Sequence, residues 1–329
     1  MTHFDDPLPN PPEPELPAQF PEEPNSIEPS GPPLLDGDPI TYAATLPPAA
    51  GYSQNPAIPE DLRISWYWPH LIVFLFFAGA SFVVVQTALF LYYGPHQPLP
   101  KEELERYLLN KPQFIFGTNL LWYAAVFFFL YVTLSVLRGA PFWSTLGWKK
   151  LKSRLSGTWG GPWAYFFGGC ALAIFVGLAS SRVHTEDNMP IQQLFKNREN
   201  AILLMCMAVL VAPLVEETVF RGYLYPLFAR ITYAITRHFG ADNSQGLRVG
   251  TKASILLTGV LFGLMHGAQL GWTWGVVALL ILVGIVFTFA RARTGTVLAS
   301  FLLHLGYNSM IAVTTIIGTH GFTRIPTSP

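Results

Sequence analysis

Seven apolar runs, each near 20 residues long, dominate the chain from residue 61 onward. A helix that rises ~1.5 Å per residue needs about 20 residues to cross the ~30 Å hydrocarbon core of a bilayer. The sequence therefore predicts an all-α, polytopic membrane protein with about seven transmembrane helices. We place these helices at about residues 69–93, 115–137, 163–181, 200–229, 253–269, 272–290 and 296–317.

The fourth run, residues 200–229, is too long for a single crossing. Pro213 lies within it, and a proline inside a helix removes one backbone hydrogen bond and crowds the preceding turn. We expect either a kink at Pro213 or an extension of this helix beyond the membrane on the cytoplasmic side.

The composition excludes an ordinary soluble domain, because 51% of the 329 residues are hydrophobic and only 12% are charged. The first 60 residues differ from the rest: they hold ten acids, no Lys or Arg, and sixteen of the 28 prolines. Such a segment buries too little apolar surface to offset the entropy of ordering it. We expect residues 1–60 to form a disordered, acidic, Pro-rich cytoplasmic tail.

Basic residues mark the predicted loops that face the cytoplasm. The loop 138–162 contains five bases and no acid, and both the loop 230–252 and the turn after residue 290 are also basic. The positive-inside rule then gives a cytoplasmic N-terminus. We expect an integral protein of a bacterial plasma (inner) membrane. The segment 142–155 is either an amphipathic helix in the cytoplasmic interface or a plain basic loop.

Few ionisable residues lie well inside the predicted spans, and those that do are Glu216, Glu217, Arg221, His266 and His304. Burying one ionised side chain at bilayer depth costs roughly 2.5–3.5 kcal/mol even on the lenient insertion scale. If these five side chains each faced lipid, the combined free-energy cost would be on the order of 10 kcal/mol. This is comparable to the stability of a whole domain. We therefore expect these side chains to face one another in one polar cavity.

The spacing of these residues suggests separate roles. Glu217 and Arg221 are four residues apart on one helix, so they can form an ion pair, and Glu216 is rotated by about 100° toward a different neighbour. His304 and Asn308 are also four residues apart and share one helix face. We take Glu216 as the candidate base and Glu217 as the partner of Arg221.

A carboxylate base, an imidazole and polar hydrogen-bond donors can activate a water and stabilise a tetrahedral oxyanion, which fits peptide-bond hydrolysis. Three other interpretations stay open at this stage. The buried groups could only tie helices together, or relay protons in a proton-coupled membrane transporter. The chain could also be a catalytically silent membrane scaffold.

Three motifs in successive polar spans resemble the family of CAAX prenyl proteases and bacteriocin-processing enzymes (CPBP, Abi-type), which are intramembrane proteases. The resemblance covers about residues 200–317 and rests on Glu216-Glu217-x-x-x-Arg221, Phe262-x-x-x-His266 and His304-x-x-x-Asn308. It says nothing of the tail or the first three spans. After the tail, we therefore expect three N-terminal transmembrane helices (61–199), a catalytic core similar to CAAX proteases (200–318) and a short C-terminal tail (319–329).

The resemblance implies roles for the motif residues. Glu216 and His266 would hold and activate the attacking water, and His304 with Asn308 would stabilise the oxyanion. Glu217 and Arg221 would orient and neutralise their neighbours. The implied reaction is endoproteolysis near the cytoplasmic leaflet, by an enzyme of the hydrolase class.

The resemblance leaves the cofactor and the substrate open. Family members are commonly classed as metalloproteases, yet His-Glu-x-x-His is missing from the sequence. Two histidines and a glutamate on separate helices could bind Zn²⁺ or simply hold a water. We favour a water held without a tightly bound metal. The expected partners are the lipid bilayer and a peptide or protein cleaved close to the membrane, lipidated or not, with no nucleic acid.

Overall fold

The computed structural model describes residues 58–151, 161–183 and 198–322. Within these ranges seven helices are long and apolar enough to cross a membrane, and no strand occurs among them. This confirms the predicted all-α, seven-span membrane protein. The predicted tail lies outside the described residues except for residues 58–60.

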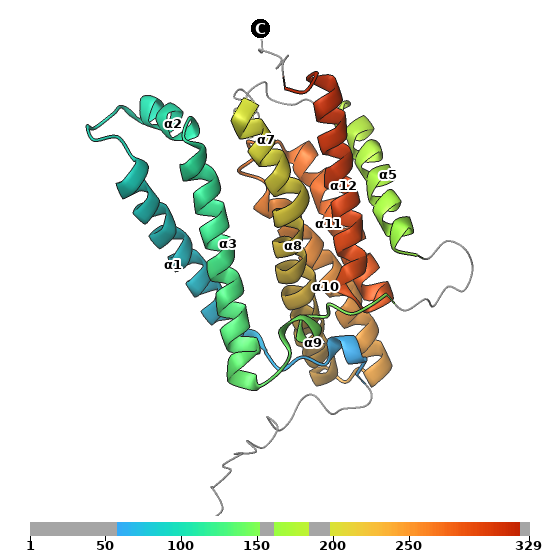
Figure 1. The fold of residues 1–329 in the computed structure, drawn as a ribbon. Helices are drawn as coiled ribbons and strands as arrows, with labels where there is room; N and C mark the ends of the chain where they lie inside the picture. Colours follow the sequence, from blue (N-terminus) through green and yellow to red (C-terminus); the bar gives the residue numbers. More distant parts are fainter. Residues whose placement is uncertain (1–57, 152–160, 184–197, 323–329) are drawn as a thin grey trace, which may run out of the picture. The chain divides into compact units, whose positions relative to one another are not determined.

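The long helices follow the predicted spans closely at most of their ends. Figure 1 shows them as α1 (Trp68–Tyr93), α3 (Pro112–Leu134), α5 (Pro162–Ser180), a continuous run from α7 to α9 (Arg198–His238), α10 (Asn243–Met265), α11 (Trp274–Thr294) and α12 (Val297–Gly318).

Two helices extend past the apolar runs that predicted them. The fourth run continues to His238, and α10 begins at Asn243 instead of residue 253. The first turns of α10 are polar, so hydropathy alone missed them. Asp242 begins this helix, because its carboxylate accepts the backbone N–H of Gln245 at 2.8 Å.

The fourth run alternates between α-helical and π-helical hydrogen bonding. In chain order it comprises α7 (Arg198–Cys206), the π-helical turn η4 (Met207–Val211), α8 (Ala212–Glu217), the π-helical turn η5 (Thr218–Leu224) and α9 (Tyr225–His238). Pro213 lies in the first turn of α8, directly after η4. Such π-helical turns are frequent at functional sites.

Close helix contacts through glycine fix α12 against α5, which lies beside it in Figure 1. A Cβ atom on Gly169 would collide with the carbonyl oxygen of Leu303, and one on Gly306 would collide with the carbonyl oxygen of Phe166. Small residues allow helices in a membrane to approach in this way. The contact holds the helix that carries His304 and Asn308.

Residues 58–66, which we call the N-terminal strap, pack against α9 and α11. Ile58 and Leu62 are buried with Tyr225 in one hydrophobic cluster. The carboxylate of Asp61 lies 3.1 Å from Nη1 of the buried Arg291 on α11. The strap thereby joins the start of α1 to α9 and α11.

Short helices lie between the spans. The helix α2 (Lys101–Leu109), which sequence reasoning did not identify, lies between α1 and α3. In the segment proposed as an interfacial helix or a basic loop, α4 (Phe142–Thr145) is a single turn. Residues 146–151 are not helical, and residues 152–155 lie outside the described part of the chain.

Candidate active site

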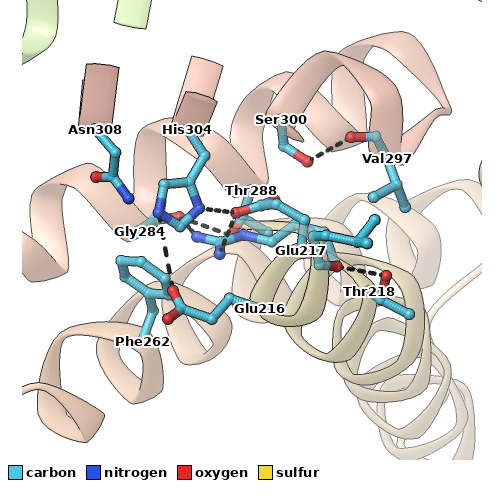
Figure 2. Close-up of polar contacts among 12 residues, drawn as sticks. Glu216, Glu217, Thr218, Phe262, Gly284, Thr288, Val297, Ser300, His304 and Asn308 are labelled. Carbon is cyan, nitrogen blue, oxygen red and sulfur yellow. Dashed lines mark hydrogen bonds and ion pairs between the residues drawn. The ribbon is translucent and has the colours of Figure 1, made fainter. Parts of the chain in front are cut away.

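The structure brings the ionisable residues of the predicted site together, and Figure 2 shows three of them, Glu216, Glu217 and His304. The ionisable residues come from α8, η5, α12 and the end of α10. Successive contacts of 4.0 Å or less link all five of them, namely Glu216, Glu217, Arg221, His266 and His304. Asn308 lies on α12 one turn beyond His304.

Arg221 is fully buried and anchors the site. Its Nη1 donates to Oε1 of Glu217 at 2.9 Å, as the spacing of four residues predicted. Its other nitrogens donate to α11, with Nη2 2.9 Å from the carbonyl oxygen of Gly284 and Nε 3.2 Å from Oγ1 of Thr288. The guanidinium therefore connects η5 with α8 and α11.

Aromatic rings enclose this buried charge. The guanidinium carbon of Arg221 lies 4.4 Å from the ring centre of Phe262 and 5.4 Å from that of Phe287. Both rings also contact the imidazole of His304, at centroid distances of 5.7 and 5.0 Å. An apolar enclosure strengthens the electrostatic interactions within it, because the local dielectric constant is low.

The proton on Nδ1 of His304 is fixed by its neighbour. This nitrogen lies 2.9 Å from Oε1 of Glu217, and an ionised carboxylate only accepts hydrogen bonds, so Nδ1–H is the donor. The remaining ring nitrogen of His304 is Nε2, which accepts a hydrogen bond when the imidazole is neutral. That atom is 3.8 Å from Oε2 of Glu216.

His266 is held in the same manner by a backbone carbonyl. Its Nδ1 lies 2.8 Å from the carbonyl oxygen of Phe262, so Nδ1–H donates and Nε2 is free to accept when the imidazole is neutral. Its Nε2 lies 4.0 Å from Oε2 of Glu216. Two imidazole Nε2 atoms thus face the same carboxylate oxygen.

The position of His266 differs from the sequence prediction, which put it within a helix spanning 253–269. The helix α10 ends at Met265, and His266 is the residue that caps it. The turn that follows includes Gly271 and Trp272 with φ values of 57° and 56°. Carbonyls in the last turn of a helix lack main-chain partners, so the imidazole of His266 satisfies the carbonyl of Phe262.

Glu216 lies at the centre of this arrangement. Among the described residues, its Oε2 is buried and has no hydrogen-bond partner. The two imidazoles, at 3.8 and 4.0 Å, are too far from it for direct hydrogen bonds. The side chain nevertheless retains 17% exposure. A buried carboxylate oxygen in this position favours a small hydrogen-bond donor between the three groups.

The same three groups do not fit a zinc ion as they are placed. With bonds of about 2.0–2.1 Å, two ligands in a tetrahedral zinc site lie about 3.3–3.4 Å apart. The two Nε2–Oε2 distances are longer, at 3.8 and 4.0 Å. No group of three or more His, Cys, Asp or Glu residues in the described ranges could hold a metal ion. We derive no catalytic step through a metal.

Asn308 has a partner that the sequence did not suggest. Its Nδ2 donates to the carbonyl oxygen of Ala208 in η4 at 2.6 Å. One of the two N–H groups of this carboxamide is therefore used, and the other remains for a further acceptor. Sequence reasoning also missed Gly284 and Thr288, since a carbonyl and a hydroxyl add no charge to an apolar span.

The fold and the site together define a class: a polytopic helical membrane protein with a buried carboxylate–imidazole site on its fourth, fifth and seventh spans. Residues 198–310, about a third of the chain, match the family of Rce1-like type II CAAX prenyl endopeptidases. The match confirms the resemblance that the three motifs indicated, and it supports an intramembrane endopeptidase in general. No curated protein and no solved structure matches the chain.

Proposed function

We propose that the protein hydrolyses peptide bonds with a water molecule held between Glu216, His266 and His304. The observation that carries this proposal is the unpartnered Oε2 of Glu216, which faces Nε2 of both imidazoles. A water at this point donates one hydrogen bond to the carboxylate and one to Nε2 of a neutral His266. It then lies beside a general base, as hydrolysis requires.

In the proposed reaction Glu216 takes a proton from the water as the water oxygen attacks the carbonyl carbon of the substrate. In this step we take the imidazole of His304 as doubly protonated: Glu217 accepts its Nδ1–H, and its Nε2–H donates to the developing oxyanion. The free N–H of Asn308 is the second donor. The C–N bond then breaks, and the proton held by Glu216 passes to the leaving amine.

Glu217 and Arg221 support the reaction without touching the substrate. The pair is fully buried, and Arg221 balances the negative charge that Glu217 brings next to His304. This fixes the ring of His304 and keeps the site close to neutral before the substrate binds.

Orientation and substrate form part of the same proposal. The basic loops favour a cytoplasmic N-terminus in a bacterial inner membrane, and therefore cleavage near the cytoplasmic leaflet. The substrate is a peptide or protein segment close to the membrane. Whether a lipid on that segment is needed is decided by comparing lipidated and unlipidated forms of one peptide.

The test uses the purified full chain in liposomes and a library of membrane-tethered peptides, including pairs with and without a prenylated cysteine. We expect cleavage by the wild type and its loss in Glu216→Gln and His266→Ala. The matched controls are Glu103→Gln and His96→Ala, because both residues are exposed outside the spans. Cleavage retained in both site variants would overturn the proposal.

A further inference from the structure

The hydrogen bond between Asn308 and Ala208 connects the catalytic face of α12 to the π-helical turn η4 (Met207–Val211). It joins two residues that are 100 positions apart in the chain. Asn308 donates one of its two N–H groups to this backbone carbonyl, although the same carboxamide is expected to donate to a substrate oxyanion. The reason for this bond lies in the proline five residues after Ala208.

The π-helical hydrogen bonding at the end of η4 leads to a position that cannot donate to the carbonyl of Ala208. The N–H of Ala212 donates to the carbonyl of Met207, five residues back, which is the π-helical pattern. In the same pattern the carbonyl of Ala208 would take the N–H of residue 213, but residue 213 is proline and has none. The carbonyl of Ala208 is therefore left without a main-chain donor.

A carbonyl without a partner is costly at bilayer depth, because no bulk water can replace the missing donor. Membrane helices tolerate proline where a neighbouring helix supplies the lost hydrogen bond. Asn308 on α12 does this for Ala208, at 2.6 Å. Pro213 is itself buried, three residues before Glu216 on α8.

We propose that Pro213 is a positioning residue: by leaving the Ala208 carbonyl open, it makes Asn308 the donor there and so fixes the carboxamide beside the catalytic centre. One N–H of the Asn308 carboxamide is held by the carbonyl of Ala208, and this fixes the direction of the other N–H. The same bond ties the turn before α8 to α12, which sets the place of Glu216 relative to His304. The catalytic part of this inference rests on the proposed function.

A double-mutant cycle on thermal unfolding tests the hydrogen bond without any substrate. In the wild-type background, which has Pro213, Asn308→Ala leaves the Ala208 carbonyl without a donor. We expect the unfolding midpoint to fall by several degrees. Pro213→Ala restores an N–H that can reach this carbonyl. In that background we expect Asn308→Ala to lower the midpoint by less than half as much. An equal fall in both backgrounds would overturn the proposal.

Asn119 provides the matched control, since it is another asparagine within a span whose Nδ2 donates to a backbone carbonyl, at 2.8 Å. Its acceptor is Ile115 on its own helix, so the effects of Asn119→Ala and Pro213→Ala should simply add. Pro213→Ser restores the same N–H and serves as the second variant. Failure of both the Ala and the Ser chains to fold would also count against the proposal, which predicts that a restored donor is tolerated.

The kinetic measurement separates positioning from stability alone. In Pro213→Ala the new N–H competes for Ala208 and releases the carboxamide of Asn308. We expect kcat to fall by up to about 100-fold with KM little changed, as is typical when a catalytic group is misplaced. An unchanged kcat would overturn the positioning role. If the wild type cleaves no peptide, the proposed function fails, while the unfolding cycle still decides the hydrogen bond.

Discussion

His304 and Glu217 meet through a single pair of atoms, with Nδ1 of the imidazole 2.9 Å from Oε1 of the carboxylate. Both side chains are buried, and the same carboxylate oxygen also accepts from Arg221. Glu217 therefore links the imidazole that faces Glu216 to the buried guanidinium of Arg221. This link is the basis of the first prediction.

Removing one member of the Glu217–Arg221 pair should destabilise the protein strongly. Arg221→Met leaves the Glu217 carboxylate buried without its counter-ion, and breaking a buried pair in this way costs about 3–5 kcal/mol. Thermal unfolding in detergent measures the effect. Replacing both residues, with Glu217→Leu and Arg221→Met, should cost less than Arg221→Met alone.

The exposed pair of Lys149 and Glu60, at 2.6 Å, is the control for this experiment. Exposed ion pairs contribute at most about 1 kcal/mol, so Lys149→Met should shift unfolding only slightly. A similar loss for Lys149→Met and Arg221→Met would contradict the view that burial makes the Glu217–Arg221 pair important.

Glu216→Gln should keep the fold and lose the reaction. The amide has nearly the shape of the carboxylate but cannot take a proton from water, and loss of a general base typically lowers kcat by about 10²–10⁴-fold. Peptide cleavage and the unfolding midpoint are measured on the same preparation. A midpoint that fell as far as in Arg221→Met would show that Glu216 is structural instead.

Gly306→Ala should disrupt the contact between α5 and α12. The added methyl group would meet the carbonyl oxygen of Phe166, and overpacking of this kind costs typically about 1–3 kcal/mol. Because α12 carries His304 and Asn308, kcat should fall as well. Unfolding and cleavage assays on one variant measure both effects.

Gly177→Ala on α5 is the matched control, because no atom lies within 4 Å of the position that its Cβ would take. Alanine is the better helix former by about 1 kcal/mol, so this variant should be as stable as the wild type or slightly more stable. Equal destabilisation by Gly177→Ala and Gly306→Ala would refute the close-contact explanation.

A zinc chelator such as 1,10-phenanthroline should leave the rate of cleavage unchanged. The spacing of Glu216, His266 and His304 fits a bridging water better than a tetrahedral metal site. Cleavage is measured before and after removal of metal from the purified protein. Activity that disappears on chelation and returns with added Zn²⁺ would replace the proposed water mechanism with a metal-dependent one.

The parts of the structure that follow from simple periodicities could be predicted from the sequence. Span lengths are set by bilayer thickness, and the Glu217–Arg221 pair follows from helical spacing. The charge cost of burial also predicted that Glu216, His266 and His304 would meet. Each of these inferences depends on a single strong physical constraint.

Other features depend on weak interactions, or on contacts with residues far away in the chain, which a single sequence does not reveal. The end of α10 at Met265 is decided by the turn that contains Gly271 and Trp272, within a run that reads as continuously apolar. The backbone carbonyl of Gly284 becomes a partner of Arg221 only because α11 packs at that register. The proline-rich composition before residue 60 gave no sign that Ile58 is buried.

The buried guanidinium of Arg221 has a consequence for how such a protein can change over evolutionary time. Through its hydrogen bonds to Glu217, Gly284 and Thr288, this one side chain both supports the proposed catalytic site and holds neighbouring helices together. A lineage that gave up catalysis could lose Glu216 alone and keep its helices assembled. Losing Arg221 alone would cost it the bundle, so inactive descendants should retain the Glu217–Arg221 pair or have replaced both residues together.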